Sequence, residues 1–553
     1  MRKETQMLIT NPLICSDMPD VDVLRRGDCY YMVSTTMFFM PGAPILKSHD
    51  LKNWEIVSYV FDRIEDNDIY ELKNGRNAYG KGQWATSLTY HNGMYYTCFV
   101  CHDMKKTFIY YTDDIEKSYW KRYEFDAAFH DMSFLFLEGR SYLVYGNGDI
   151  RIIELDDDLS RIKEGGVDRI LFSTPTEGIG LRCEGCRAIV RDGYIYLLFI
   201  EWPKDGNERR REVCYRAKSL DEEFERRIIM DDDCGYRNCG VAQGTIFDDE
   251  DGNWYCMMFQ DHGAVGRIPY LMPMKWEDGW PLPGTDGKVP RSFEIPGEES
   301  GVGDITGEES GVCDTAGEEK GAGDTAAVVS PVIRNLIISD TFTHAENVLP
   351  VQFQWNHNPI PDAWSFTERP GYLRLEAAHI ADGLLTARNT LTERTATPFS
   401  SFTIEGDFSR MNEGDHAGLA AFMGFYGTIG LKRSDGEYYL YAEKKDSPDE
   451  TLGVSEITGF DEGSFFLRID FDFEEGDDTA HFYYSTDGTE YTEFGAPLQM
   501  RFTLDLFVGY RIGIFMYGTE MTGGIADFKN LKFSCDKKIY RDEQGAISSS
   551  LLG

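Results

Sequence analysis

The sequence predicts an all-β protein, a five-bladed β-propeller followed by a β-sandwich. Three observations predict it: hairpin-like segments recur five times before residue 295, an acidic decapeptide is repeated three times at 297–326, and short alternating strands fill the region from residue 334 to residue 536. At 553 residues the chain is long enough for two such domains. We therefore expect a propeller at 1–295, a linker at 296–333, a sandwich at 334–540 and a flexible tail at 541–553.

The recurring unit is a hairpin in which a glycine-containing turn joins an apolar run to a run rich in aromatic and other apolar residues. Asn-Gly or Asp-Gly between alternating runs is the strongest short-range signal of a hairpin. The interval between the turns fits one four-stranded blade, whereas a sandwich would give hairpins without this recurrence. The turn glycines are 66, 46, 54 and 59 residues apart: Gly27, Gly93, Gly139, Gly193 and Gly252.

The decapeptide repeats at 297–326 contain nine acidic residues, one basic residue and eight glycines. Such a segment buries too little surface to offset its ordering entropy, so we expect a flexible linker or surface insert. The region after it alternates apolar and polar residues between frequent turns, which is typical of a β-sandwich. The expected strands include residues 372–376, 402–406, 438–442, 465–470 and 480–484.

Composition excludes several classes of partner. The chain has 55 Lys and Arg against 94 Asp and Glu, a net charge of -39, which repels nucleic acid and anionic lipid. No stretch approaches the ~20 apolar residues of a membrane-spanning helix, and the first residues lack the pattern of a secretory signal, so we expect a cytoplasmic protein. The two CxxC pairs, Cys98/Cys101 and Cys183/Cys186, are expected to be reduced, buried thiols rather than zinc ligands.

The residues that precede the hairpins are the candidates for chemistry, because the innermost strands of a propeller begin around one central funnel. Three of the five hairpins are preceded by a carboxylate, a fourth by a tryptophan and the fifth by a glutamine: Asp20, Asp131, Glu184, Trp84 and Gln243. A single Asp at a strand start is often only a turn or cap residue. Three in matching register, with an aromatic surface, suit the acid–base hydrolysis of a glycoside.

Several ordered motifs resemble glycoside hydrolase family 43, which contains five-bladed-propeller β-xylosidases and α-L-arabinofuranosidases. The resemblance covers most of the chain outside the decapeptides, and its C-terminal part is similar to the sandwich domain of many members. The motifs include Asn11-Pro-Leu-Ile, Pro41-Gly-Ala-Pro-Ile, Tyr79-Gly-Lys-Gly-Gln-Trp84, His130-Asp131-Met-Ser, Glu184-Gly, Phe259-Gln-Asp-His262-Gly-Ala-Val-Gly-Arg267, Trp355-Asn-His-Asn-Pro and Glu368-Arg-Pro-Gly-Tyr.

The resemblance implies a role for each of the three acids. Asp20 matches the general base, Asp131 the carboxylate that tunes pKa values and orients, and Glu184 the general acid. The usual Pro-Asp-Pro-Ser reads Pro-Asp-Val-Asp at residues 19–22, so Asp22 adds a second charge beside the expected base. Of the two aspartates, Asp20 keeps the better alignment.

The remaining candidates are substrate-binding residues and metal ligands. We expect Phe38, Trp84 and Gln243 to line the sugar pocket, although buried aromatic residues are often only core. Arg267 is expected to bind sugar hydroxyls or to hold Asp131 or Glu184. Three further residues are candidate metal ligands: His262 in the channel, and Asp340 with Asp527 in a structural Ca²⁺ site of the sandwich.

The expected activity is that of an inverting exo-glycosidase that releases terminal xylose from short β-1,4-xylo-oligosaccharides without a required cofactor. An α-L-arabinofuranosidase, or an enzyme with both activities, is the alternative, because a furanose and a xylopyranose present similar hydroxyl arrangements. A propeller that binds carbohydrate without catalysis is a more distant alternative. The expected partner is an oligosaccharide, with no nucleic acid and no membrane, and a homo-oligomer is left open.

Overall fold

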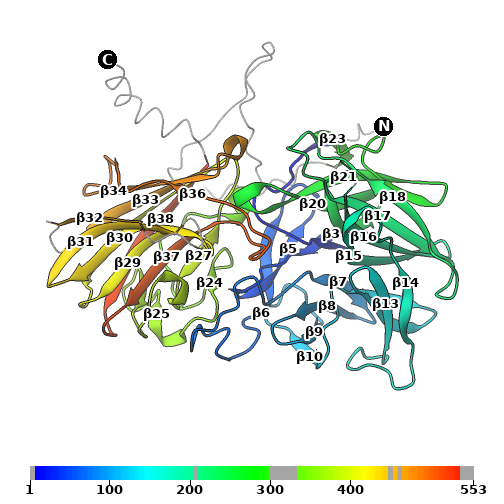
Figure 1. Ribbon diagram of the computed structural model, residues 1–553, viewed down its shortest axis with the longest axis horizontal. Helices are drawn as coiled ribbons and strands as arrows, with labels where there is room; N and C mark the ends of the chain where they lie inside the picture. The colour runs from blue at the N-terminus through cyan, green and yellow to red at the C-terminus, as the bar shows by residue number, and fades with distance from the viewer. Residues whose placement is uncertain are drawn as a thin grey trace, which may run out of the picture.

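The structure is a computed structural model that describes residues 6–204, 206, 208–297, 333–445, 453–458 and 464–535. It is almost entirely β and consists of two lobes, with the N-terminal half in one and the C-terminal half in the other (Figure 1). The helical elements are α1 (Ile333–Leu336) and four short 3₁₀ segments, η1 (Gly263–Val265), η2 (Pro361–Ala363), η3 (Leu384–Thr386) and η4 (Glu474–Gly476). The decapeptide repeats from residue 298 onward and the tail at 541–553 lie outside the described residues.

The N-terminal lobe is the expected five-bladed propeller, because it contains five separate four-stranded antiparallel sheets. The chain completes one sheet before it begins the next, so each blade is a local meander around a common axis. The first blade contains β2 (Asp22–Arg26), β3 (Cys29–Val33), β5 (Gly42–Ser48) and β6 (Glu55–Phe61), and the second contains β7 (Ser87–His91), β8 (Met94–Cys101), β9 (Lys106–Thr112) and β10 (Lys121–Phe125). The third contains β11 (Ser133–Leu137), β12 (Arg140–Tyr145), β13 (Asp149–Leu155) and β14 (Asp168–Ser173), and the fourth contains β15 (Ile179–Arg191), β16 (Tyr194–Pro203), β17 (Arg211–Ala217) and β18 (Glu225–Met230). The fifth contains β19 (Ala242–Asp248), β20 (Trp254–Asp261), β21 (Arg267–Glu277) and β22 (Trp280–Pro283).

The five turn glycines each join the first two strands of a blade, as the sequence predicts. The turn between β7 and β8 shows the reason: Asn92 has φ 49° and Gly93 has φ 86°. Two successive residues with positive φ form the type I′ turn, which matches the right-handed twist of the paired strands. Asn tolerates this conformation and Gly adopts it without steric cost, so the dipeptide specifies the hairpin.

The C-terminal lobe is a sandwich of two large antiparallel sheets, and all five strands expected from the alternation are present in it. One sheet has the order β32 (Gly453–Thr458), β31 (Glu437–Lys445), β30 (Tyr426–Ser434), β29 (Asp415–Phe422), β37 (Arg511–Gly518), β27 (Leu391–Arg394), β24 (Gln354–Asn356) and β4 (Phe39–Met40). The other has the order β25 (Trp364–Ser365), β26 (Leu373–Glu376), β38 (Ile525–Ser534), β28 (Phe399–Arg410), β33 (Ser464–Asp472), β34 (Thr479–Ser485) and β35 (Thr492–Glu493), with β36 (Leu498–Gln499) also on β34.

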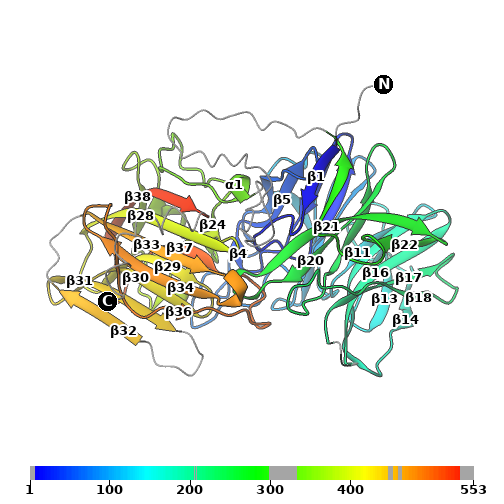
Figure 2. The ribbon, with the colours of Figure 1, turned by 90° about the horizontal axis from the view of Figure 1, so that it is seen from above.

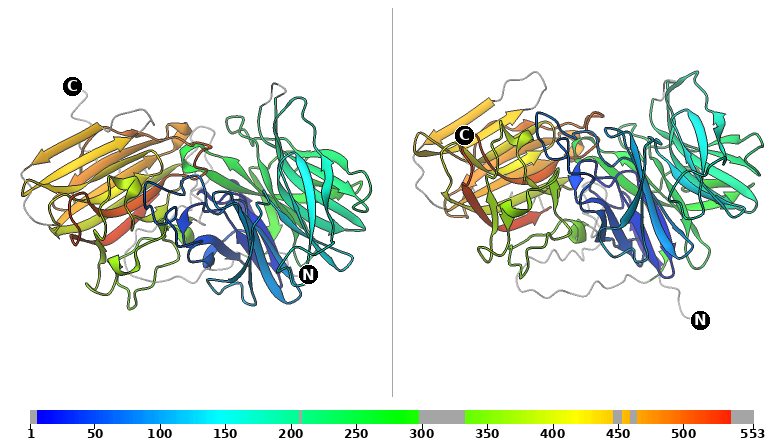
Figure 3. Two further views of the ribbon diagram at one scale, coloured as in Figure 1. Left: turned by 60° about the horizontal axis from the view of Figure 1, so that its bottom comes forward. Right: turned by 90° about the horizontal axis from the view of Figure 1, so that it is seen from below.

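The two lobes share backbone pairing as well as side-chain contacts. Strand β4 leaves the first blade and becomes the edge strand of a sandwich sheet, with Met40 opposite Trp355 (Figure 2). The buried guanidinium of Arg511 lies 3.6 Å from the centre of the Phe39 ring and donates to Gln354 Oε1 at 2.9 Å. The interface is therefore continuous with the cores of both domains, and the lobes lie against each other in every view (Figure 3).

Strand β1 (Gln6–Thr10) pairs with β23 (Ser292–Pro296), which brings the first described residues beside the end of the propeller. The cysteines of both CxxC pairs are buried free thiols, as expected. Within the described ranges, none of the helices has the length and apolar character that a membrane crossing requires.

We predict that cutting the chain between residues 297 and 333 leaves the lobes associated, because β4 and the buried residues around it belong to both domains. A specific protease site placed after Gly311 allows the cut to be made at one position. The two fragments should co-elute in size-exclusion chromatography and separate only in denaturant, with the uncut chain as the control. Two separate peaks in native buffer would contradict the continuous interface.

Candidate active site

A cavity of about 360 Å³ lies where the first strands of the blades meet the sandwich. It is bordered by all five residues that the sequence placed before the hairpins, and by Arg267. The expected register therefore brings three carboxylates from the first, third and fourth blades to one site. The five are Asp20, Trp84, Asp131, Glu184 and Gln243.

Irregular backbone aims these side chains into the cavity. Asp20, Asp131 and Gln243 have φ values of 56°, 47° and 59°, in the left-handed region that non-glycine residues seldom occupy. Glu184 lies between two register shifts in the pairing of β15 with β16, and Gln243 is skipped in the pairing of β19 with β20. Such bulges and strained residues concentrate at functional sites because the surrounding structure holds them there.

Asp20 is buried and held by two donors on one oxygen. Gln243 Nε2 and Arg267 Nη1 each donate to Asp20 Oδ1 at 2.9 Å. The side chains of Asp20 and Arg267 are only 5% and 6% exposed, so the ion pair is desolvated and its geometry is well defined. Because both donors reach Oδ1, Oδ2 is left to accept a proton from a water molecule.

Asp131 and Glu184 lie together on adjoining blades and share a histidine. Asp131 Oδ2 accepts the Gly185 N–H at 3.1 Å, which ties it to the backbone beside Glu184. His130 Nε2 lies 3.0 Å from Glu184 Oε2 and 3.7 Å from Asp131 Oδ2. Asn147 Nδ2 also donates to Glu184 Oε2. Glu184 is thus fixed in position while its side chain remains 20% exposed to the cavity.

The surroundings of this cluster raise the pKa values of both Asp131 and His130. Burial raises the pKa of Asp131 to about 6, and the negative charges of Glu184 and Asp20 reinforce that shift against the opposing effect of His130. Burial lowers the pKa of His130, but the charge of Asp131 and the hydrogen bond with Glu184 outweigh it and raise the value to about 9. The site can therefore hold exchangeable protons near neutral pH, which acid–base catalysis requires.

Aromatic and imidazole rings pack together beside the carboxylates. His102 Nε2 lies 2.9 Å from His130 Nδ1, and Trp84 packs edge-on to His102 with ring centres 4.9 Å apart. Burial, together with the charge of His130, lowers the pKa of His102, so that ring is suited to accept a hydrogen bond from its protonated neighbour. The Trp84 ring also packs against Phe507 at 5.2 Å.

The sandwich completes the cavity, because Leu504 and Phe507 border it. Arg267 Nη2 donates to the Phe507 carbonyl at 3.1 Å, and Asp17 accepts the backbone N–H groups of Arg267 and Gly509 at 2.8 and 3.0 Å. The lobes approach so closely that a Cβ on Gly509 would lie 2.1 Å from the Val265 carbonyl oxygen. Glycine is required at this position for steric reasons.

One of the expected substrate contacts, Phe38, needs correction. Phe38 has no exposed surface and lies in the interface core, with its ring 4.5 Å from Phe39 and 5.1 Å from His357. Its neighbour Met37 borders the cavity instead. Arg267 borders the cavity, as a residue expected to bind hydroxyls should, and the carboxylate that its guanidinium holds is Asp20 rather than Asp131 or Glu184.

The structure separates Asp22 from the cavity and so removes the ambiguity over the candidate base. Asp22 Oδ2 lies 3.3 Å from Arg187 Nε and accepts the Leu88 N–H at 2.8 Å. Arg187 is 2% exposed and also donates to the Asp20 and Thr86 carbonyls, both at 3.0 Å. The Asp22–Arg187 pair therefore supports the backbone beneath Asp20 from inside the propeller.

The residues expected as metal ligands each have side-chain partners within the protein. His262 Nε2 lies 2.7 Å from Gln260 Oε1, and the ring stacks on Tyr236 at 4.0 Å. Asp340 interacts with His344 Nε2 at 3.0 Å, whereas Asp527 accepts hydrogen bonds from Arg369 and Arg374. The described residues hold two groups of three metal-ligating side chains within 4.8 Å of one another, His130 with Asp131 and Glu184, and Asp28 with Cys29 and His49. Neither group includes His262, Asp340 or Asp527.

Sequence reasoning missed His130, His102, Asn147 and Phe507 at this site. His130 directly precedes Asp131, so its position carried a usable signal. His102 follows a strand end of the second blade, and Asn147 a strand end of the third. Phe507 belongs to the other domain and only the contact between the lobes brings it to the cavity.

We predict that His130 stabilises the fold below neutral pH. Its pKa of about 9 lies above the ~6.5 of an unfolded histidine, so its contribution is complete below about pH 6.5 and is lost as pH rises through about 9. The difference in thermal midpoint between the wild type and His130→Gln should therefore shrink from about pH 6 to about pH 10. A difference that stays constant over this range would show that His130 is not protonated in the folded state.

Comparison with known families agrees with this architecture. The model for glycosyl hydrolases family 43 matches residues 9–281, and that for the β-xylosidase C-terminal concanavalin A-like domain matches residues 339–534. A β-xylosidase of Formosa agariphila is 25% identical, over 94% of this chain and 88% of its own. A non-reducing end α-L-arabinofuranosidase of Bacteroides ovatus is 25% identical, over 68% of this chain and 66% of its own.

A solved structure of this family also matches the chain over nearly its whole length. A bifunctional GH43-CE protein of Bacteroides eggerthii is 37% identical with a TM-score of 0.85 over 96% of this chain. This chain spans 64% of the length of that protein. Both domains of the chain are thus matched, in the order that the structure shows, and the chain belongs to glycosyl hydrolase family 43.

Proposed function

We propose that the protein is an inverting exo-glycosidase that releases terminal xylose from short β-1,4-xylo-oligosaccharides. The observation that carries this proposal is the carboxylate-lined cavity at the propeller funnel. Its volume of about 360 Å³ lies at the lower end of the range of ligand pockets, which suits one or two sugar units. Leu504 and Phe507 wall the cavity from the sandwich side, and such a wall favours chain ends over the interior of a polymer.

In the proposed reaction Asp20 is the general base and Glu184 the general acid. Asp20 Oδ2 takes a proton from a water molecule, and that water oxygen forms the new bond to the anomeric carbon. Glu184 gives its proton to the glycosidic oxygen as the old bond breaks, so the leaving sugar departs as an alcohol. The chemistry uses only water and protons and requires no cofactor.

Asp131 and His130 are assigned positioning roles. Asp131 accepts the Gly185 N–H and so orients the backbone that carries Glu184. His130 holds Glu184 Oε2 at 3.0 Å. The carboxylates around the cavity offset the developing positive charge on the sugar ring, while Arg267 pairs with Asp20 and His130 with Glu184.

Trp84 offers an apolar face for a sugar ring, as carbohydrate sites commonly do. Its indole nitrogen is buried without a hydrogen-bond partner among the described residues, whereas the ring borders the cavity.

An α-L-arabinofuranosidase, or an enzyme with both activities, is the second candidate. The Bacteroides ovatus relative with that activity matches 68% of this chain, and no cavity residue distinguishes a furanose from a xylopyranose. Hydrolysis of aryl β-xyloside and aryl α-L-arabinofuranoside, measured side by side, separates the two. Turnover of neither substrate would favour the third candidate, a propeller that binds carbohydrate without cleaving it. A cytoplasmic location, in which imported oligosaccharides are the substrate, and any homo-oligomer remain part of the proposal.

We predict that hydrolysis inverts the anomeric centre, with Asp20 and Glu184 bordering the cavity from separate blades. An inverting pair needs its carboxyl groups about 6.5–9.5 Å apart to admit water, against about 5–5.5 Å for a retaining pair. Proton NMR of the first-formed sugar from an aryl β-xyloside should show α-xylose. Initial β-xylose would overturn the assignment of Asp20 as a base.

We predict that Glu184→Ala slows xylobiose hydrolysis far more than hydrolysis of a nitrophenyl xyloside. A nitrophenolate leaves without a proton donor, whereas a sugar alcohol does not. Asp20→Ala should slow both substrates alike, by about 10²–10⁴-fold, because both need the activated water.

The matched control for this comparison is Glu208→Ala, which removes a carboxylate that borders the same cavity. This substitution should change the rates of hydrolysis of the two substrates by the same factor, since Glu208 has no assigned role in proton transfer. Equal losses on both substrates for Glu184→Ala would exclude that residue as the acid.

A further inference from the structure

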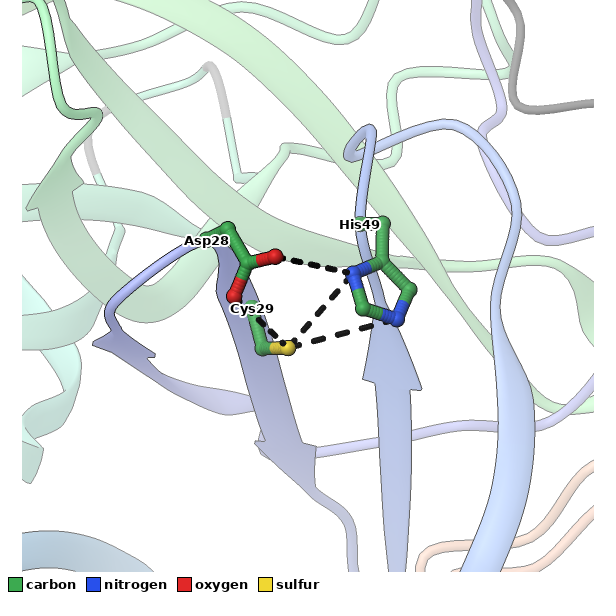
Figure 4. Close-up of side chains that lie close together, drawn as sticks. All are labelled: Asp28, Cys29 and His49. Carbon is green, nitrogen blue, oxygen red and sulfur yellow. Dashed lines mark hydrogen bonds and ion pairs between the residues drawn. The ribbon is translucent and has the colours of Figure 1, made fainter.

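A second cluster of reactive side chains lies on the first blade, away from the cavity. Asp28 and Cys29 follow the turn at Gly27, and His49 follows the end of β5. Strands β3 and β5 pair with Tyr30 opposite Ser48, so the same register continues with Cys29 opposite His49. The three side chains converge on one small space between the two strand ends (Figure 4).

The separations within the cluster match those of a tetrahedral metal site. Zn²⁺ binds sulfur at ~2.3 Å and nitrogen or oxygen at ~2.0–2.1 Å, so a tetrahedron places S and N, or S and O, about 3.5 Å apart. Cys29 Sγ lies 3.5 Å from His49 Nδ1 and 3.5 Å from Asp28 Oδ1. The other oxygen of that carboxylate, Asp28 Oδ2, lies 4.0 Å from His49 Nδ1, and one donor atom from each residue lies within 4.8 Å of the others, so the carboxylate must shift to reach the ~3.3 Å nitrogen–oxygen edge of an ideal site.

The side chains can close that gap without a change in the backbone. The side chain of Asp28 is 83% exposed and that of His49 is 50% exposed, so each can rotate by a small amount. Cys29 is the most enclosed of the three and stands at the beginning of a strand, which gives the site a rigid sulfur donor. A water molecule can occupy the fourth position.

The donor chemistry selects the class of ion. A thiolate and an imidazole favour Zn²⁺ or a similar thiophilic divalent cation over Ca²⁺ and Mg²⁺, which prefer oxygen ligands. A cation in the cluster would be balanced by the thiolate and by Asp28. The nearest basic side chain, Lys47, is directed to Glu116 Oε1 at 2.7 Å and so does not already neutralise the cluster.

The cluster and the cavity lie at opposite ends of one strand. Asp20 precedes β2 at the funnel, whereas Asp28 follows the turn at the other end of that strand. A cation in the cluster would tie the β2–β3 turn to the end of β5 without touching the substrate. This arrangement is therefore independent of the proposed hydrolysis.

We propose that Asp28, Cys29 and His49 form a three-ligand site for Zn²⁺ or a similar thiophilic divalent cation, on the propeller face opposite the cavity. The site ties two strand ends of the first blade together when the cation is bound.

Titration of the full chain with Co²⁺ tests the site, because a cobalt–thiolate bond gives a near-ultraviolet charge-transfer absorption. The cluster of His130, Asp131 and Glu184 contains no sulfur, so Co²⁺ bound there cannot produce that absorption. One equivalent of Co²⁺ should generate the band in the wild type, and Zn²⁺ should displace it. Cys29→Ser should abolish the band, and His49→Ala should weaken Co²⁺ binding at least about tenfold.

Matched cysteine variants provide the control. Cys239→Ser removes another partly exposed thiol, and Cys313→Ser removes the thiol of the decapeptide region, and both should retain the band. As a second measurement, Zn²⁺ should slow alkylation of Cys29 but not of Cys239, followed by peptide mass spectrometry. Each variant's activity on an aryl glycoside verifies that it is folded.

Absence of the band in the wild type, or its persistence in Cys29→Ser, would overturn the proposal. Equal alkylation of Cys29 with and without Zn²⁺ would also overturn it.

Discussion

The buried ion pair between Asp20 and Arg267 is the interaction on which the rest of the site depends. A carboxylate removed from water must be paired or it takes up a proton, and removing one partner of such a pair typically costs ~3–5 kcal/mol. Arg267 also donates to the Phe507 carbonyl, and its own N–H is accepted by Asp17, which holds Gly509 as well. The Arg267 guanidinium thus holds both Asp20 and the Phe507 carbonyl, while the Arg267 backbone N–H shares Asp17 with Gly509 of the sandwich.

On the other side of the cavity, the negative charges of Asp131 and Glu184 are close enough to repel each other. His130 lies between them and carries the compensating charge, while Asn147 and the Gly185 N–H supply neutral donors. The two halves of the site therefore differ in kind. Asp20 is paired with the permanent cation of Arg267, whereas the other side contains Asp131 and His130, whose pKa values of about 6 and about 9 allow proton exchange near neutral pH.

Strain and domain contact act together to hold this arrangement. Asp20, Asp131 and Phe507 all have positive φ, which costs free energy at each residue and persists only where neighbours over-determine the backbone. Those neighbours include the buried Arg187 beneath Asp20 and the close approach of Gly509 to the propeller. Since β4 crosses from the first blade into the sandwich, the wall that carries Phe507 is part of the same folded unit as the blades.

The sequence by itself determined the blades, the sandwich strands and the register that brings Asp20, Asp131 and Glu184 to one funnel. Each of these follows from short-range rules: a positive-φ Asn-Gly turn specifies a hairpin, alternation specifies a strand face, and repetition of the hairpin specifies a ring of blades. Only the tertiary structure decided the rest. Phe38 belongs to the interface core, Arg267 pairs with Asp20, His130 joins the two acids, and Phe507 closes the cavity from more than two hundred residues away. These contacts join segments that are far apart in the sequence. No local pattern relates such segments, because the contacts depend on how the strand ends of different blades and of the sandwich pack against one another.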